Sequence, residues 1–267
     1  MSRLDTTFAA LRARGERALV AYVMAGDPSL AATRRLVVQA ERSGVDVIEL
    51  GVPFSDPLGD GPVIQRAGVR ALAAGTTLPR VLELAAELRG EVSIPLVLMT
   101  YYNPVFAFGL KSFARTAADA GVDGVIVPDL PIEEAEPLES EVGPAGLDLV
   151  QLVAPTSSPA RVRAIARRSR GFVYVVSVTG TTGERREVPK DLAGQIRTLR
   201  AVTTKPVCVG FGISDAAQVA TVGRLADGVA VGSAIVRMIE QRGQSASLVD
   251  DLGAFLASLK APLKVAG

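Results

Sequence analysis

The sequence contains no histidine among its 267 residues. Histidine is the most common general base in enzymes and a frequent metal ligand. Its absence excludes serine or cysteine nucleophiles activated by histidine, and it excludes zinc sites of the usual His/Cys kind. We therefore expect no metal site, and any acid–base chemistry must depend on Asp, Glu, Lys, Tyr or Cys side chains.

Cysteine, charge bias and long apolar runs are also scarce. Cys208 is the only cysteine, so no intrachain disulfide can form, which fits a reducing compartment. Lys and Arg total 29 against 28 Asp and Glu. This balance provides no net positive charge that would attract nucleic acid or an anionic membrane. The N-terminal segment lacks the apolar core of a signal peptide, and no run approaches the roughly 20 apolar residues of a spanning helix. We expect a soluble cytoplasmic protein with no nucleic-acid or membrane partner.

Short runs rich in Val, Ile and Leu alternate with amphipathic stretches along the chain. The runs are typical of strands buried in a parallel sheet, and they lie at 18–24, 45–50, 96–101, 124–127, 147–153, 172–177, 207–209 and 228–231. The amphipathic stretches predict helices at 31–43, 78–89, 111–120, 133–142, 159–168, 190–201 and 216–222. Similar turns, SGVD, AGVD and AGLD, lead into three of the strands and indicate one β/α unit used repeatedly.

This alternation predicts an α/β fold of the (β/α)8 TIM-barrel type. A doubly wound open sheet is the alternative, because periodicity alone does not show that the sheet closes. The composition does not change along the chain, so we expect a single domain over residues 1–267 with a short extra N-terminal helix near residues 4–14. The long interval between the second and third strands is expected to hold two helices, the first from about residue 63.

One carboxylate lies near the end of the second predicted strand, and a second lies in the loop that follows it. Glu49 lies near the end of an apolar run, and Asp60 follows in a loop rich in Gly and Pro. Catalytic residues of TIM barrels come from the C-terminal ends of strands, and apolar surroundings raise the pKa of a carboxyl toward neutral pH. We expect acid–base chemistry from this pair. The alternatives are a structural ion pair for Glu49 and ordinary turn chemistry for Asp60. Asp129 is interpreted as a cap for a helix near residue 132 or as a group facing a partner.

Glycine separates strand from helix in the last two turns of the barrel. The segments VGFGISD and VGSAI place Gly212, Gly232 and Ser233 there. Glycine lets backbone N–H groups approach an anion, and phosphate sites of TIM barrels often use the loops after strands seven and eight. These residues predict a phosphate site, with tight turns as the alternative. The glycine-hinged loop at 179–191 predicts a lid or a solvated surface loop. Tyr174, within the sixth strand, packs in the core or faces the barrel mouth.

The segment ELGVPFSDPLGDGPVIQ, residues 49–65, resembles the signature of the tryptophan synthase alpha chain family. The resemblance continues through AYVMAGDP, LMTYYNPVF, GVIVPDLPIEE, TGTTGER, VGFGIS and ADGVAVGSAIV, and therefore covers essentially the whole chain. It implies a TIM-barrel lyase of tryptophan biosynthesis that cleaves indole-3-glycerol phosphate to indole and glyceraldehyde 3-phosphate by a retro-aldol reaction. It implies no cofactor in this chain.

The resemblance also implies a role for each candidate residue. Glu49 matches the carboxylate that transfers protons, and Asp60 matches the one that accepts a hydrogen bond from the indole N–H. Thr182 matches a lid threonine that engages the Asp60 loop. The remaining matches are Tyr22 and Tyr174 around the indole, and Gly183, Gly212, Gly232 and Ser233 at the phosphate.

A partner follows from the same resemblance. The family implies a beta chain that carries pyridoxal phosphate and receives the indole, in an α2β2 complex. The resemblance supports partner contacts at residues 56–62, 101–106 and 129–132. Two alternatives stay open: a subunit that chiefly activates the beta chain, and another phosphate-binding barrel enzyme such as a sugar-phosphate isomerase.

Overall fold

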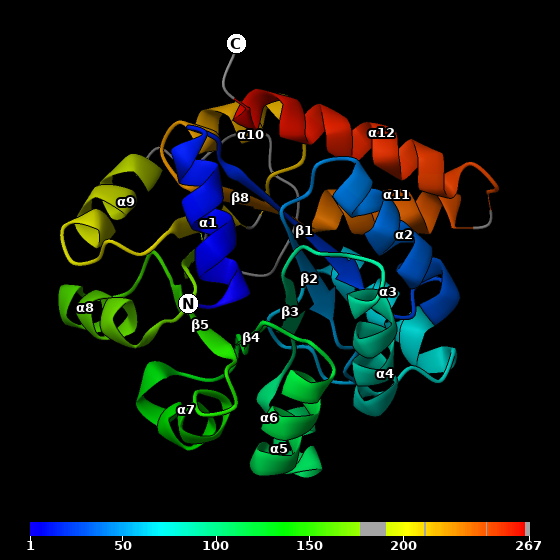
Figure 1. Cartoon of the computed structure of the whole chain (residues 1–267), viewed down its shortest axis with the longest axis horizontal. Helices are drawn as coiled ribbons and strands as arrows, with labels where there is room; N and C mark the ends of the chain where they lie inside the picture. The colour runs from blue at the N-terminus through cyan, green and yellow to red at the C-terminus, as the bar shows by residue number, and fades with distance from the viewer. Residues whose placement is uncertain (177–190, 211, 244, 265–267) are drawn as a thin grey trace.

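Eight parallel strands close into a barrel in the computed structural model, which describes residues 1–176, 191–210, 212–243 and 245–264 (Figure 1). The strands pair in chain order, and the last pairs back with the first. They are β1 (Ala18–Met24), β2 (Val47–Gly51), β3 (Leu96–Met99), β4 (Gly124–Ile126), β5 (Asp148–Val153), β6 (Val173–Val176), β7 (Val207–Gly210) and β8 (Gly228–Val231). This closure confirms the predicted TIM barrel and excludes the open doubly wound sheet.

Helices form an outer ring around the barrel (Figure 1). The connections between strands contain α2 (Leu30–Arg42), α4 (Leu78–Arg89), α6 (Leu110–Asp119), α7 (Glu136–Val142), α8 (Pro159–Arg168), α9 (Leu192–Arg200) and α10 (Ala216–Gly223). The ring also includes α3 (Pro62–Ala73) before α4, α5 (Tyr102–Phe108) before α6, α11 (Ser233–Arg242) and α12 (Leu248–Lys260) after β8, and the 3-10 turns η1 (Ile132–Glu134) and η2 (Ala261–Leu263). Over the described ranges, no helix is both long and apolar enough to span a bilayer.

The observed elements differ from the predicted ranges chiefly near the barrel mouth. The third strand is predicted to reach residue 101 but ends at Met99, because α5 begins at Tyr102. The second strand, predicted over 45–50, includes Gly51 as its last residue. The predicted helix at 190–201 is described from Leu192. These differences matter because each falls at the end of the barrel where catalytic residues are expected.

The helix α1 (Arg3–Ala13) closes the N-terminal end of the barrel. Its apolar residues Leu4, Phe8 and Leu11 are buried in one cluster with the side chains that fill the barrel interior. The rings of Phe8 and Phe172 lie 5.7 Å apart within this cluster. The short extra N-terminal helix is thus confirmed, and the open mouth of the barrel lies at the opposite end.

Aspartates at the strand starts tie neighbouring strands together at the closed end of the barrel. Backbone N–H groups donate to them in three pairs, Leu19 to Asp46, Leu96 to Asp123 and Val207 to Asp227, with N···O distances of 2.7, 2.8 and 2.8 Å. Each aspartate also pairs with a basic side chain, respectively Lys260, Arg89 and Arg200. The aspartates of the repeated turns SGVD and AGVD therefore serve to fasten each strand start to the one before it.

The pair formed by Lys260 and Asp46 is almost completely buried. The two side chains are 4% and 14% exposed, with Nζ 2.7 Å from Oδ2, and Nζ also donates to the carbonyl of Arg17 at 3.0 Å. Removing one member of such a pair leaves the other charge buried without a partner. We expect Lys260→Met to lower the free energy of unfolding by about 3 kcal/mol in urea denaturation.

The matched control for this change is Arg34→Met. Arg34 forms an exposed ion pair with Glu91, and exposed pairs contribute less than about 1 kcal/mol. If Lys260→Met destabilises the protein no more than Arg34→Met does, the buried pair does not stabilise the closed end of the barrel.

Candidate active site

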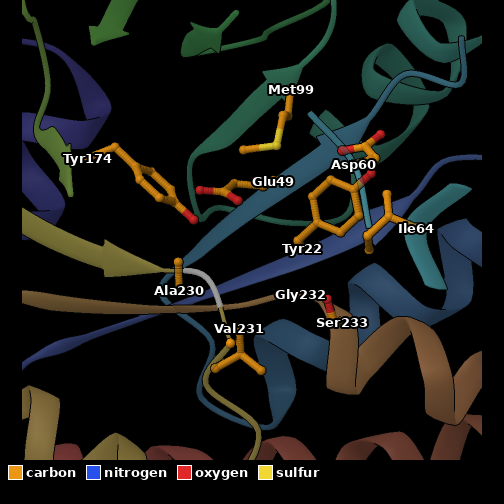
Figure 2. Close-up of a pocket in the computed structure, with 11 residues that line it drawn as sticks. Tyr22, Glu49, Asp60, Ile64, Met99, Tyr174, Ala230, Val231, Gly232 and Ser233 are labelled. Carbon is orange, nitrogen blue, oxygen red and sulfur yellow. The ribbon is translucent and has the colours of Figure 1, made fainter. Parts of the chain in front are cut away.

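A pocket opens at the C-terminal ends of the strands, with an empty volume of about 430 Å³ when the open solvent at its mouth is included. Figure 2 shows side chains from several strands directed into it. It is lined by Tyr22, Glu49, Asp60, Ile64, Met99, Tyr174, Gly212, Ala230, Val231, Gly232 and Ser233. Every predicted site residue within the described ranges is in this one pocket, whereas Thr182 and Gly183 lie outside the described residues.

Glu49 is a buried carboxyl group on β2, directly beside Tyr22 of β1 in the strand register. Its side chain projects between Tyr22 and Tyr174 in Figure 2, and the residue is 1% exposed. Among the described residues, Oε1 has no hydrogen-bond donor. Burial removes water from the charged form and raises the pKa of Glu49 from 4.5 to about 8. At neutral pH the group therefore holds a proton that it can give up and take back.

The raised pKa of Glu49 makes the stability of the protein depend on pH. Between 4.5 and about 8, the folded protein holds a proton on Glu49 that the unfolded chain releases. The contribution of this group to the free energy of unfolding therefore falls as pH rises through that window. Glu49→Gln has no such proton. We expect its stability relative to the parent protein to rise by on the order of 3 kcal/mol between about pH 5 and about pH 9.

Urea denaturation of both proteins at the two pH values measures this difference. Titration of groups that do not interact with Glu49 cancels in the comparison, and the pKa values of Tyr22 and Tyr174, which do interact with it, are raised well above this pH range. A stability difference that stays constant from the acidic to the alkaline condition would contradict a buried, protonated Glu49.

Asp60 lies in the loop between β2 and α3, where Tyr101 holds it. The Tyr101 hydroxyl hydrogen-bonds to the Asp60 carboxyl and accepts the N–H of Gly59 at 3.0 Å, while its ring lies 5.4 Å from that of Phe54. Burial raises the pKa of Asp60 from 3.8 to about 6, and the hydrogen bond from Tyr101 opposes the rise. At neutral pH Asp60 is thus mostly ionised and can accept a hydrogen bond from a ligand. Tyr101 is predicted from sequence only as a partner contact.

Tyr22 and Tyr174 each lie across a glycine of the neighbouring strand. A Cβ added to Gly51 would fall 2.1 Å from the Tyr22 hydroxyl, and one added to Gly210 would fall 2.0 Å from the Tyr174 hydroxyl. Side-chain atoms do not approach so closely, so glycine at these positions is what leaves room for the two rings. Burial raises the pKa of both tyrosines, which keeps their hydroxyls neutral. Neither glycine is predicted as a site residue, because each accommodates a side chain from another strand.

The start of α11 and the turn after β7 form another part of the pocket lining. Ser233 is the first residue of α11 and is buried, and Gly232 precedes it. Gly212 has a φ of 92°, a left-handed conformation that favours glycine. The first turn of α11 contains no acidic residue, and the N-terminus of a helix attracts anions through its free N–H groups and dipole. This side of the pocket is therefore suited to a phosphate group.

Two other residues singled out in the sequence have structural roles. Asp129 accepts the N–H of Tyr102 at 2.9 Å, so it caps α5 and not the turn near residue 132. Cys208 is fully buried in the barrel interior, where it packs as a core residue. In the part of the chain that the structure describes, no group of His, Cys, Asp and Glu side chains is arranged to hold a metal ion.

Known proteins resemble the chain along nearly all of its length. A family model described as "Tryptophan synthase alpha chain" matches residues 8–262. The tryptophan synthase alpha chain of Citrifermentans bemidjiense is 52% identical over 260 residues, which cover 97% of each chain. That of Geotalea uraniireducens is 50% identical over 268 residues, which cover 100% of each chain.

Solved structures show the same likeness. Tryptophan synthase subunit alpha from Legionella pneumophila is 37% identical, with a TM-score of 0.91 and coverage of 98% of both chains. A chain of Mycobacterium tuberculosis tryptophan synthase is 37% identical, with a TM-score of 0.90 and coverage of 99% of both chains. These matches span the strands and helices that line the pocket.

Proposed function

The chain belongs to the tryptophan synthase alpha chain family, and we propose that the pocket at its barrel mouth is where its reaction takes place. That reaction, the alpha reaction of tryptophan biosynthesis, cleaves indole-3-glycerol phosphate to indole and glyceraldehyde 3-phosphate. The chain is therefore a lyase. The residues of the pocket supply the chemical groups that this cleavage needs.

Glu49 is the proton-transferring group in this proposal. To break the bond between indole C3 and the first glycerol carbon, C3 must gain a proton and the hydroxyl on that glycerol carbon must lose one. The electron pair of the broken bond returns to the ring, and the carbon–oxygen double bond of the aldehyde forms. A carboxyl with a pKa of about 8 can protonate C3, and the carboxylate left behind can then take the hydroxyl proton.

Asp60 holds the indole ring. Its carboxylate, mostly ionised at neutral pH because its pKa is about 6, accepts the indole N–H and stabilises the positive charge that develops on the ring when C3 is protonated. Tyr22 and Tyr174 border the ring. The phosphate is held by Gly212, Gly232 and Ser233, and Thr182 and Gly183, outside the described residues, complete the site.

One observation carries this proposal: a neutral carboxyl and an ionised carboxyl, Glu49 and Asp60, line the same pocket. Two carboxyl groups whose pKa values are separated by their surroundings can divide the work of proton transfer and charge stabilisation. The test is to incubate the purified protein with indole-3-glycerol phosphate and to measure indole and glyceraldehyde 3-phosphate, with and without a beta chain. Release by the protein alone supports catalysis in this pocket, and release only with the beta chain supports a subunit that depends on its partner. No release in either case refutes the proposal.

Family membership implies a beta chain as partner, and the arrangement proposed here is an α2β2 complex. Leu58, on the Asp60 loop, and Phe106, on α5, are 86% and 63% exposed. Both side chains lie within residues 56–62 and 101–106, two of the segments expected to contact the partner, and both segments adjoin the residues that hold Asp60. The pyridoxal phosphate of the complex is proposed to belong to the beta chain, with no cofactor in this chain.

The proposal also covers how much of the chain forms the domain and in which cellular compartment the protein works. Residues 1–267 are proposed to act as one domain, since α1 packs inside the closed end of the barrel and α12 packs against α2 on its outside (Figure 1). The cytoplasm is proposed as the compartment, because a free buried thiol fits a reducing environment.

A further inference from the structure

An ion-pair network joins two neighbouring helices that each carry part of the pocket lining. Asp60 lies two residues before Pro62, the first residue of α3, and α11 begins at Ser233. Arg70 of α3 donates through Nη1 to Glu240 of α11 at 2.8 Å. The same guanidinium donates through Nε and Nη2 to both carboxylate oxygens of Asp27, at 2.8 and 2.7 Å. Arg70 therefore fastens α3 to α11 and to the loop after β1.

The geometry of this network is well defined. Asp27 is only 2% exposed, and a bidentate contact with a planar guanidinium fixes orientation as well as distance. Glu240 also accepts from Arg66 at 2.7 and 2.8 Å. The hydrogen bonds from Arg66 and Arg70 lower the pKa of Glu240 to about 2, so its carboxylate stays charged at all working pH values. The ion-pair network therefore persists throughout the pH range in which acid–base chemistry takes place.

An apolar layer also joins α3 to β1 and α11 beneath the network. It consists of Tyr22 and Met24 of β1, Val63, Ile64, Ala67 and Ala71 of α3, and Val236 of α11. Two of the four α3 residues are alanines, whose small side chains bury little apolar area. The ion pairs toward the C-terminal end of α3 therefore add directional contacts that hold α3 to α11 and to the loop after β1.

We propose that Arg70 is a positioning residue, which sets the separation between Asp60 and the phosphate side of the pocket. Arg70 does not line the pocket itself, so it acts through the placement of α3. The inference rests on the proposed function, in which the substrate spans from Asp60 at the ring to α11 at the phosphate. A misplacement of about 1 Å at one end of such a substrate can lower the rate by up to about 100-fold.

The variants that test this inference are Arg70→Met and Glu240→Gln, with Arg34→Met as the matched control. Arg34 pairs with Glu91 between α2 and the end of α4, away from the pocket. We expect Arg70→Met to lower kcat for indole release about 10-fold, with partial recovery in Arg70→Lys. Glu240→Gln keeps the contact between Arg70 and Asp27, and is expected to change kcat in the same direction by less.

Binding of two ligands distinguishes a positioning role of Arg70 from a loss of folded protein in the variant. Indole-3-propanol phosphate carries the ring and the phosphate but lacks the hydroxyls needed for cleavage, whereas glycerol 3-phosphate carries the phosphate end alone. In titration calorimetry of Arg70→Met, we expect the Kd of indole-3-propanol phosphate to rise about 5-fold. We expect the Kd of glycerol 3-phosphate to stay within about twofold of the parent value. A partly unfolded variant would bind fewer ligands per chain without a change in either Kd.

The proposal is overturned if both Kd values stay within about twofold of the parent in Arg70→Met and in Glu240→Gln, or if both ligands weaken equally. Arg34→Met is expected to match the parent in every measurement. Failure of the parent protein to release indole both alone and with a beta chain is a different result, which refutes the proposed function and not the role of Arg70.

Discussion

Glu49→Gln is expected to lower kcat for indole release about 1,000-fold, within the range that general acid–base groups contribute. The glutamine amide has nearly the same shape as the carboxyl but cannot give a proton to indole C3 or take one from the glycerol hydroxyl. Because the side chain stays uncharged, its burial on β2 is preserved. The measurement is indole release at saturating substrate, with the Kd of indole-3-propanol phosphate as a check that the site is intact.

The control for this result is Glu49→Asp. It keeps a carboxyl but withdraws it by one methylene, so we expect a loss between that of Glu49→Gln and none. If Glu49→Gln turns over at close to the parent rate, another group performs the proton transfer and the assignment of Glu49 is wrong.

Ser233→Asp is expected to raise KM for indole-3-glycerol phosphate about 100-fold or more, because it places a carboxylate where the phosphate binds. The fold should survive, since an acidic residue in the first turn of a helix interacts favourably with the helix dipole by about 0.5 kcal/mol. The same feature that makes the start of α11 attractive to phosphate thus makes it tolerant of aspartate. Steady-state kinetics and the Kd of glycerol 3-phosphate measure the effect.

Ser233→Ala serves as the matched control. It removes one hydroxyl without adding charge, and we expect its KM to rise less than about 10-fold. An unchanged Kd for glycerol 3-phosphate in Ser233→Asp would show that the phosphate binds elsewhere.

The strands of the barrel were predictable because each is a short run of Val, Ile and Leu bounded by turn residues. Closure was favoured by the number of strands and by the family resemblance but did not follow from periodicity, because it depends on the pairing of β8 with β1, as in the register of Ala18 with Gly228, and periodicity contains no register. The helix α5 was also not predicted. It has seven residues, too few for a hydrophobic period to emerge, and its start is capped by Asp129 from a distant loop.

The same distinction applies to the candidate site. Glu49 and the glycine turns could be predicted because the barrel topology brings every strand end to one mouth. The hydrogen bond between Tyr101 and the Asp60 loop could not, since it joins segments 42 positions apart. The packing of Tyr22 against Gly51 and of Tyr174 against Gly210 could not be predicted either, because strand register, and not local sequence, determines which residues face each other.

The helix α1 closes the N-terminal end of the barrel, so the pocket at the opposite end has no opening along the barrel axis. Because Leu4, Phe8 and Leu11 pack into the barrel interior from below, molecules cannot pass along the barrel axis. In the part of the chain that the structure describes, the pocket is therefore reached from the end of the barrel where the Asp60 loop and the start of α11 lie. A product that stays bound at this end occupies the pocket and keeps the next substrate molecule out.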